Sequence, residues 1–172
     1  HDSSWGKCPR PFGGYCVMRN NGPAHASSRK VKAVPDSTCE AETLMASKAA
    51  KDTVATRIVL QDVGYPVKGP TPLLGDNQAT RDVIVMPGTS SRTRYFERAT
   101  LIVKRLYMKC VVAPWLVPTK FMVADIFTKM LDRDAFFLCR SYLMNLDNAP
   151  SQMVPGRFAA MTRQWTRLLW SP

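Results

Sequence analysis

An Asn-Gly dipeptide between two strand-like segments restricts the fold of this chain more than any other local feature. The apolar run Tyr15-Cys16-Val17-Met18 ends at Asn20-Asn21-Gly22, and a second strand-like segment follows over about residues 23–34. Asn-Gly in this setting is typical of a tight antiparallel hairpin, because both residues tolerate the positive φ values of the turn. We therefore expect neighbouring antiparallel strands in the first part of the chain.

The residues after the hairpin change to helical periodicity. Ser37 and Glu40 form a Ser-x-x-Glu capping box, which favours a helix start. Apolar residues then recur at mostly helical spacing towards Val63: Ala41, Leu44, Met45, Ala49, Ala55, Ile58 and Val59. This stripe predicts a long helix towards Val63.

Strand-like and helical segments alternate along the following residues. We expect a strand over 71–75, helices over 77–86 and 93–108, a strand over 109–117 and a helix from 123 to about 145. Pro114 lacks a backbone N–H, so it places the last strand at a sheet edge. The order of elements predicts an α/β fold with a mixed sheet flanked by helices.

The charge of the chain favours a polyanionic partner. Lys and Arg number 24 against 13 Asp and Glu in 172 residues, which gives a formal net charge of +11. Nucleic acid is the first candidate and an anionic membrane surface the second. A solvated basic surface, or a subunit of a larger charged assembly, stays open as an alternative. The length suits one domain with a substantial core.

The cysteines argue against both a zinc site and a disulfide framework. The five cysteines have no Cys-x-x-Cys spacing, and their number is odd. We expect an intracellular, reducing compartment. No run is long and apolar enough to predict a transmembrane segment, and the first residues do not have the pattern of a signal peptide.

Four carboxylates stand where different elements should begin or end: Asp2, Glu42, Asp76 and Asp125. The chain has few acids and only three glutamates, so these placements are informative. Carboxylates from distant elements repel one another unless a cation lies between them, and Mg²⁺ prefers oxygen ligands. The pattern predicts a site for two Mg²⁺ ions of the kind that two-metal nucleases use. Each acid, taken singly, could instead be a helix cap or a turn residue.

Six short motifs surround these acids in a fixed order. They are Asp2-Ser3-Ser4-Trp5, Gly14-Tyr15-Cys16-Val17, Ser27-Ser28-Arg29-Lys30 with Ser37-Thr38-Cys39-Glu40-Ala41-Glu42, Gly75-Asp76-Asn77-Gln78, Arg92-Thr93-Arg94, and Val117-Pro118-Thr119 with Ala124-Asp125-Ile126-Phe127-Thr128-Lys129. Together they resemble the ribonuclease H domain that ends the polyprotein of Ty1/copia-type retrotransposons. The resemblance covers residues 2 to about 145.

This resemblance implies a ribonuclease H-like fold over residues 1–147, with a five-stranded mixed sheet. It also implies cleavage of the RNA strand of RNA/DNA hybrids. Asp2, Glu42, Asp76 and Asp125 take the metal-binding and catalytic positions of the family, whereas Glu40 suits a capping role.

Some residues depart from the family pattern and support a second interpretation. Ser4 replaces an acid, Tyr95 replaces a histidine, and few residues precede Asp2, so we expect Asp2 to be poorly held on a shortened strand. The alternative function is a domesticated, catalytically silent domain that acts as a basic binding module or an architectural subunit.

Substrate and partner contacts are expected from two sets of residues. The cations proposed to follow a nucleic-acid backbone are Arg29, Lys30, Lys32, Arg92, Arg94 and Lys129. For any one of them, a solvated surface charge is the simpler interpretation. Residues 148–156 resemble a linker, and 157–172 an amphipathic tail helix. Its apolar face, predicted to dock on its own domain or on a partner, consists of Phe158, Met161, Trp165, Leu168 and Leu169.

Overall fold

The computed structural model describes residues 1–4, 11–19, 22–32, 34–88 and 96–146. Its strands are β1 (Asp2–Ser3), β2 (Phe12–Arg19), β3 (Gly22–Lys30), β4 (Thr71–Gly75) and β5 (Val112–Leu116). Its helices are α1 (Thr38–Asp62), α2 (Gln78–Val85), α3 (Glu97–Met108) and α4 (Arg133–Leu143), with the 3-10 segments η2 (Thr119–Phe121) and η3 (Val123–Phe127). The predicted mixed α/β fold is confirmed at this level.

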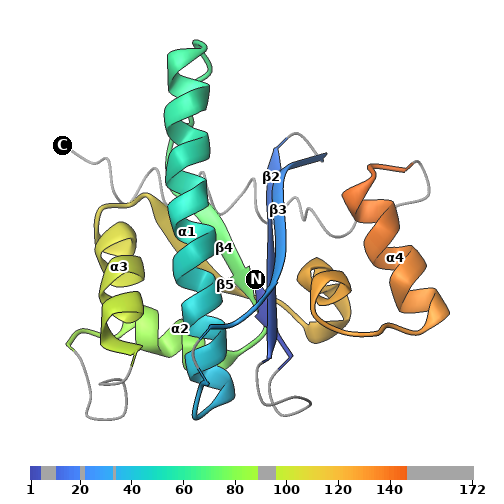
Figure 1. Cartoon of the computed structure of the whole chain (residues 1–172). Helices are drawn as coiled ribbons and strands as arrows, with labels where there is room; N and C mark the ends of the chain where they lie inside the picture. Colours follow the sequence, from blue (N-terminus) through green and yellow to red (C-terminus); the bar gives the residue numbers. More distant parts are fainter. Residues whose placement is uncertain (5–10, 20–21, 33, 89–95, 147–172) are drawn as a thin grey trace.

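The described strands form two sheets. β1, β2 and β3 make an antiparallel sheet in which Asp2 pairs with Gly14 and Phe12 with Lys30. β4 and β5 make a parallel pair. The His1 amine, beside β1, donates a hydrogen bond to the Leu74 carbonyl oxygen of β4 at 3.0 Å. This contact brings the two sheets together at the N-terminus, where Figure 1 shows β1 close to the end of β4.

The helix α1 contacts β1, β2 and β4 of the two sheets and the helices α2 and α3, whereas α4 lies on the other side of β3 (Figure 1). The α1 alanines 46, 49 and 50 are buried, and their small side chains allow close approach to the strands. The main core consists of Tyr15, Ala46, Ala49, Ala50, Leu73, Ile84, Val103 and Val112. These residues come from β2, α1, β4, α2, α3 and β5, so the core connects both sheets.

Local caps set several helix starts. Ser37 caps α1, because its side chain accepts a hydrogen bond from the Glu40 N–H at 3.1 Å. The Glu40 carboxylate in turn accepts from the Asp36 N–H at 2.9 Å. The predicted capping role of Glu40 is confirmed. Asn77 caps α2 in the same way, through the Thr80 N–H.

The expected long helix over about 123–145 is wrong. The chain forms the short η3 segment first, and α4 begins only at Arg133. The side chain of Asp132 accepts a hydrogen bond from the Ala135 N–H at 2.8 Å and caps α4. A new helix start therefore interrupts the helix, although the apolar spacing continues across it.

The long helix predicted towards Val63 is confirmed as α1, but its apolar stripe is not buried throughout. Ile58 and Val59 are 54% and 60% exposed, although both match the helical period. In this part of α1, Thr53, Thr56, Arg57 and Leu60 face the strand residues 17–19 and 71–72, and Arg57 donates to the Thr71 hydroxyl at 2.9 Å, so Ile58 and Val59 lie on the outer side of the helix, whose upper half Figure 1 shows above the strands.

Several expectations concern residues outside the described ranges. These expectations are the linker over 148–156, the tail helix over 157–172 with its docking residues, and the cations Arg92 and Arg94. Within the described part of the chain, no helix is both long and apolar enough to cross a membrane.

Candidate metal centre

Asp2 lies on β1 in a buried position. Its side chain is 3% exposed, and its Oδ2 accepts a hydrogen bond from the Thr128 hydroxyl. The Lys129 ammonium lies 3.4 Å from the same oxygen. The expectation of a poorly held Asp2 is therefore wrong, because strand pairing with Gly14 and these side-chain contacts fix it.

Glu42 comes from the beginning of α1 and reaches the same region. Its Oε1 accepts a hydrogen bond from the Asn77 side-chain amide at 3.2 Å. Its Oε2 is buried and has no hydrogen-bond partner among the described residues. Burial raises the pKa of Glu42 to about 7, with further contributions from Asp76 and Asp2 that the Asn77 hydrogen bond opposes.

Asp76 directly follows β4, as predicted. One carboxylate oxygen from each of Asp2, Glu42 and Asp76 lies within 4.8 Å of the others. Opposite oxygen ligands of an octahedral Mg²⁺ ion are about 4.2 Å apart. The acidic cluster (Asp2, Glu42 and Asp76) is thus close to the size that one divalent cation requires.

Asp125 lies beside the acidic cluster rather than within it. It belongs to η3, a 3-10 segment of 5 residues, and not to the first turn of an α-helix as expected. Burial raises the pKa of Asp125 to about 6, and the Asp2 carboxylate adds to the increase, whereas Lys129 opposes it.

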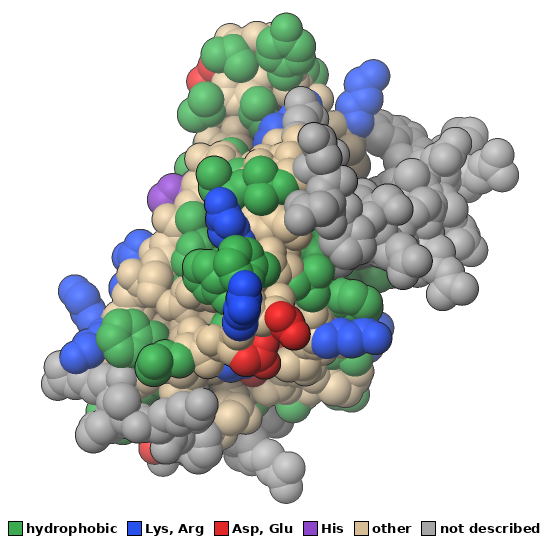
Figure 2. Space-filling view, turned by 90° about the vertical axis from the view of Figure 1, so that its right-hand side faces the viewer, with side chains coloured by type: hydrophobic (Ala, Val, Ile, Leu, Met, Phe, Trp, Pro, Cys, Tyr) green, Lys and Arg blue, Asp and Glu red, His purple; other side chains and the backbone are tan. Residues whose placement is uncertain are grey.

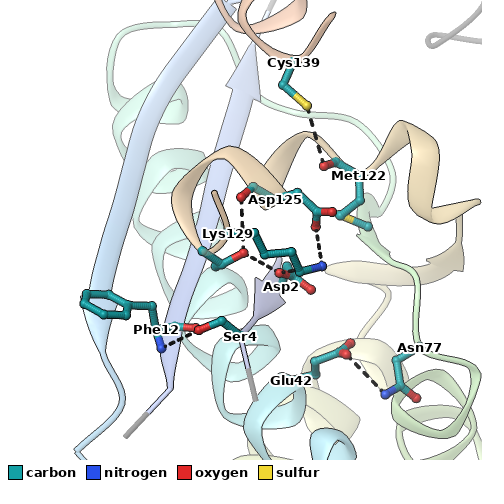
Figure 3. Close-up of polar contacts among 10 residues, drawn as sticks. Asp2, Ser4, Phe12, Glu42, Asn77, Met122, Asp125, Lys129 and Cys139 are labelled. Atoms are coloured by element: carbon teal, nitrogen blue, oxygen red, sulfur yellow. Dashed lines mark hydrogen bonds and ion pairs between the residues drawn. The ribbon is translucent and has the colours of Figure 1, made fainter. Parts of the chain in front are cut away.

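Lys129 extends into this site. Its Nζ donates a hydrogen bond to Asp125 Oδ1 at 3.1 Å and lies 3.4 Å from Asp2 Oδ2. Burial tends to lower the pKa of Lys129, but Asp2 and Asp125 together raise it. Figure 3 shows the Lys129 amine between these two carboxylates, with Glu42 and Asn77 across the site. The predicted phosphate contact of Lys129 stays a prediction.

Two functional neighbours were not assigned roles from the sequence. Asn77 both caps α2 and donates to Glu42, and Thr128 donates to Asp2. Asn77 follows Asp76 directly, so its position after a strand-end acid was an available signal. The Thr128 contact depends on long-range packing of η3 against β1, which no local pattern encodes.

The predicted cations on and after β3 are exposed. The side chains of Arg29, Lys30 and Lys32 are exposed to solvent, as a phosphate contact requires. Arg29 Nε donates to Ser27 Oγ at 2.9 Å, and Lys30 lies over the Phe12 ring. Figure 2 shows Lys and Arg side chains spread over the face seen from the α4 side, interleaved with hydrophobic ones.

Comparison with known proteins identified no relative of this chain. No model of a protein family, no curated protein and no solved structure matches this chain.

Proposed function

We propose that the chain is a ribonuclease H-like domain derived from a retrotransposon, which cleaves the RNA strand of RNA/DNA hybrids with Mg²⁺. The convergence of Asp2, Glu42 and Asp76 carries this proposal. Their oxygens come from β1, α1 and the end of β4, yet they lie within 4.8 Å of one another. The buried Glu42 Oε2 without a hydrogen-bond partner also fits a cation ligand.

The arrangement of the strands supports the same proposal. The antiparallel β1-β2-β3 sheet and the parallel β4-β5 pair meet where His1 contacts Leu74. If β1 bridged the two sheets, they would form one five-stranded mixed sheet. The acidic cluster lies at this junction, and helix α1 brings Glu42 to it.

The residues divide the proposed chemistry between them. Asp2, Glu42 and Asp76 would hold the ion, and Asn77 would keep the Glu42 carboxylate oriented through its hydrogen bond. A bound Mg²⁺ would make an attacking water more acidic and polarise the scissile phosphate. Lys129 would place a fixed positive charge beside Asp2 and Asp125, where it could face a phosphate oxygen.

Substrate binding would depend on exposed cations. Arg29, Lys30 and Lys32 lie on or just after β3 and are accessible to a nucleic-acid backbone. Such contacts hold phosphates without reading base sequence, so affinity would fall steeply with salt. The hybrid would be recognised by its shape and by its 2′-hydroxyl groups.

Cleavage of a labelled RNA/DNA hybrid in Mg²⁺ tests this function. We expect the RNA strand to be cut by the wild-type chain, with a loss of at least about 100-fold in Asp76→Asn. Asp62→Asn, at the exposed end of α1, removes one acid outside the site and should keep full activity. Absence of cleavage by the folded wild-type chain, or equal rates for Asp76→Asn, would overturn the proposal.

A catalytically silent binding domain is the second candidate. The observation that favours it is the Lys129 ammonium, which already neutralises part of the charge between Asp2 and Asp125. This candidate predicts binding of the hybrid in EDTA, with no cleavage when Mg²⁺ or Mn²⁺ is added.

A further inference from the structure

We infer that the site takes one divalent cation, in the acidic cluster, and that the Lys129 ammonium fills the position of a second cation between Asp2 and Asp125. This inference rests on the proposed function for its context and specifies the metal use of the same site. It replaces the expected pair of metal ions with one ion and one side-chain cation.

The position of the single ion follows from the acidic cluster. Its three carboxylates converge, and Asn77 satisfies only one oxygen of Glu42. The other oxygen, Oε2, is buried without a hydrogen-bond partner in the described part of the chain, and Glu42 is only 6% exposed. A buried carboxylate oxygen in this state needs a cation or a donor, because the interior does not solvate it.

The position of Lys129 follows from two carboxylates on different segments. Its Nζ lies 3.1 Å from Asp125 Oδ1 and 3.4 Å from Asp2 Oδ2, and its side chain is 27% exposed. The Lys129 N–H also donates to the Asp125 carbonyl oxygen at 2.9 Å, which holds the two residues one turn apart. Figure 3 shows the amine directed at both acids.

Asp2 therefore faces both cation positions. It belongs to the acidic cluster on one side and contacts Lys129 on the other. A second divalent ion that bound Asp2 and Asp125 would need the space that the ammonium fills, and the two positive charges would repel each other at contact distance. Binding of two ions therefore requires Lys129 to move away.

Replacement of Lys129 should consequently create a second metal site. In Lys129→Met the side chain keeps a similar length but loses its charge, which leaves the Asp2 and Asp125 carboxylates without their cation. Lys129→Arg keeps a positive charge between them. Lys51→Met, at an exposed position of α1, is the matched control for loss of a lysine.

Titration with Mn²⁺ alone, followed by calorimetry and by the electron paramagnetic resonance signal of free Mn²⁺, tests this inference. We expect one ion per chain for wild type, Lys129→Arg and Lys51→Met. We expect two ions for Lys129→Met, with the second bound at least about 10-fold more tightly than any second ion in wild type. Asp76→Asn should lose the first ion.

Two results would overturn the inference: two ions of comparable affinity in wild type, or a single ion in folded Lys129→Met. Two ions of comparable affinity in wild type would overturn the inference even if Lys129→Met does not fold. A chain that binds one ion but cuts no hybrid would refute the nuclease function and leave the assignment of Lys129 intact. A chain that cuts hybrids with two bound ions would support the nuclease function and refute the assignment of Lys129.

Discussion

Thr128 donates its side-chain hydroxyl to Asp2 Oδ2, and this buried hydrogen bond ties β1 to the residue that follows η3. The Thr128 N–H donates to the Asp125 carbonyl oxygen at 3.0 Å. One residue thus connects the first acid of the site to the segment that carries the last one. The separation between Asp2 and Asp125 depends on Thr128 as well as on Lys129.

Thr128→Val should destabilise the chain, because it leaves a buried carboxylate oxygen with one donor fewer. A hydrogen bond to a charged group contributes about 1.5–3 kcal/mol, so we expect a loss of that size in the free energy of unfolding measured with urea. Thr56→Val is the control, since its hydroxyl donates only to the Asp52 carbonyl oxygen in α1. A loss no larger than that of the control would contradict this role of Thr128.

The stability of the metal-free chain should fall as the pH rises from about 4.5 to about 7. Burial, with the nearby Asp76 and Asp2, raises the pKa of Glu42 from 4.5 to about 7, so the folded chain holds a proton that the unfolded chain has released. The stability is therefore greatest below the unfolded pKa and lowest above the folded one, by on the order of 3 kcal/mol for this group.

Urea unfolding in EDTA at pH 5 and pH 8 measures this dependence. Glu42→Gln should weaken the dependence of the unfolding free energy on pH. A smaller decrease with rising pH should remain, because the pKa of Asp125 is also raised. Mg²⁺ should restore stability at pH 8 in wild type only. A metal-free wild-type chain whose dependence on pH equals that of Glu42→Gln would disprove the assignment.

Asn77 has two separable roles. Asn77→Ser keeps a residue type that caps helix α2 well but removes the donor to Glu42, whereas Asn77→Asp keeps the cap and places a fourth acid against the acidic cluster. In EDTA we expect Asn77→Asp to melt at a lower temperature than Asn77→Ser. Added Mg²⁺ should raise the melting temperature of Asn77→Asp more than that of wild type. Equal metal responses would show that Asn77 does not face the site.

Gly14 permits the close approach of η3 to β2. A Cβ at this position would lie 2.5 Å from Phe127 Cβ and 3.0 Å from Thr128 Cγ2. Gly14→Ala should therefore displace η3, cost about 1–3 kcal/mol of stability and weaken Mn²⁺ binding. Gly22→Ala is the matched control, because its Cβ would meet only the Arg19 carbonyl oxygen at 3.8 Å. Similar unfolding curves for the two variants would argue against this packing role.

Local signals in the sequence predicted the elements that local interactions determine. The strand over 71–75 and the capping box at Ser37 are confirmed as expected. The apolar pattern after Val123 did not reveal the interruption at Asp132, because helical spacing continues across a new cap. The exposure of Ile58 could not be predicted either, since at this level of α1 Thr56, Arg57 and Leu60, and not the apolar stripe, face the strands.

The candidate site was predictable to a similar degree. The positions of Asp76 after a strand and Glu42 in a helix were readable from the chain, and the structure brings both to Asp2. The direction of Lys129 was not readable, because it depends on η3 packing beside β1. Local spacing from Asp125 alone is also compatible with a lysine that points to solvent.

Anomalous scattering from a crystal of the chain soaked in Mn²⁺ tests most directly whether one divalent cation and Lys129 share this site. We expect one strong peak, within about 2.0–2.3 Å of oxygens from Asp2, Glu42 and Asp76, with the Lys129 ammonium still beside Asp125. A map with no peak at the acidic cluster, or with two peaks and Lys129 displaced, would contradict this expectation.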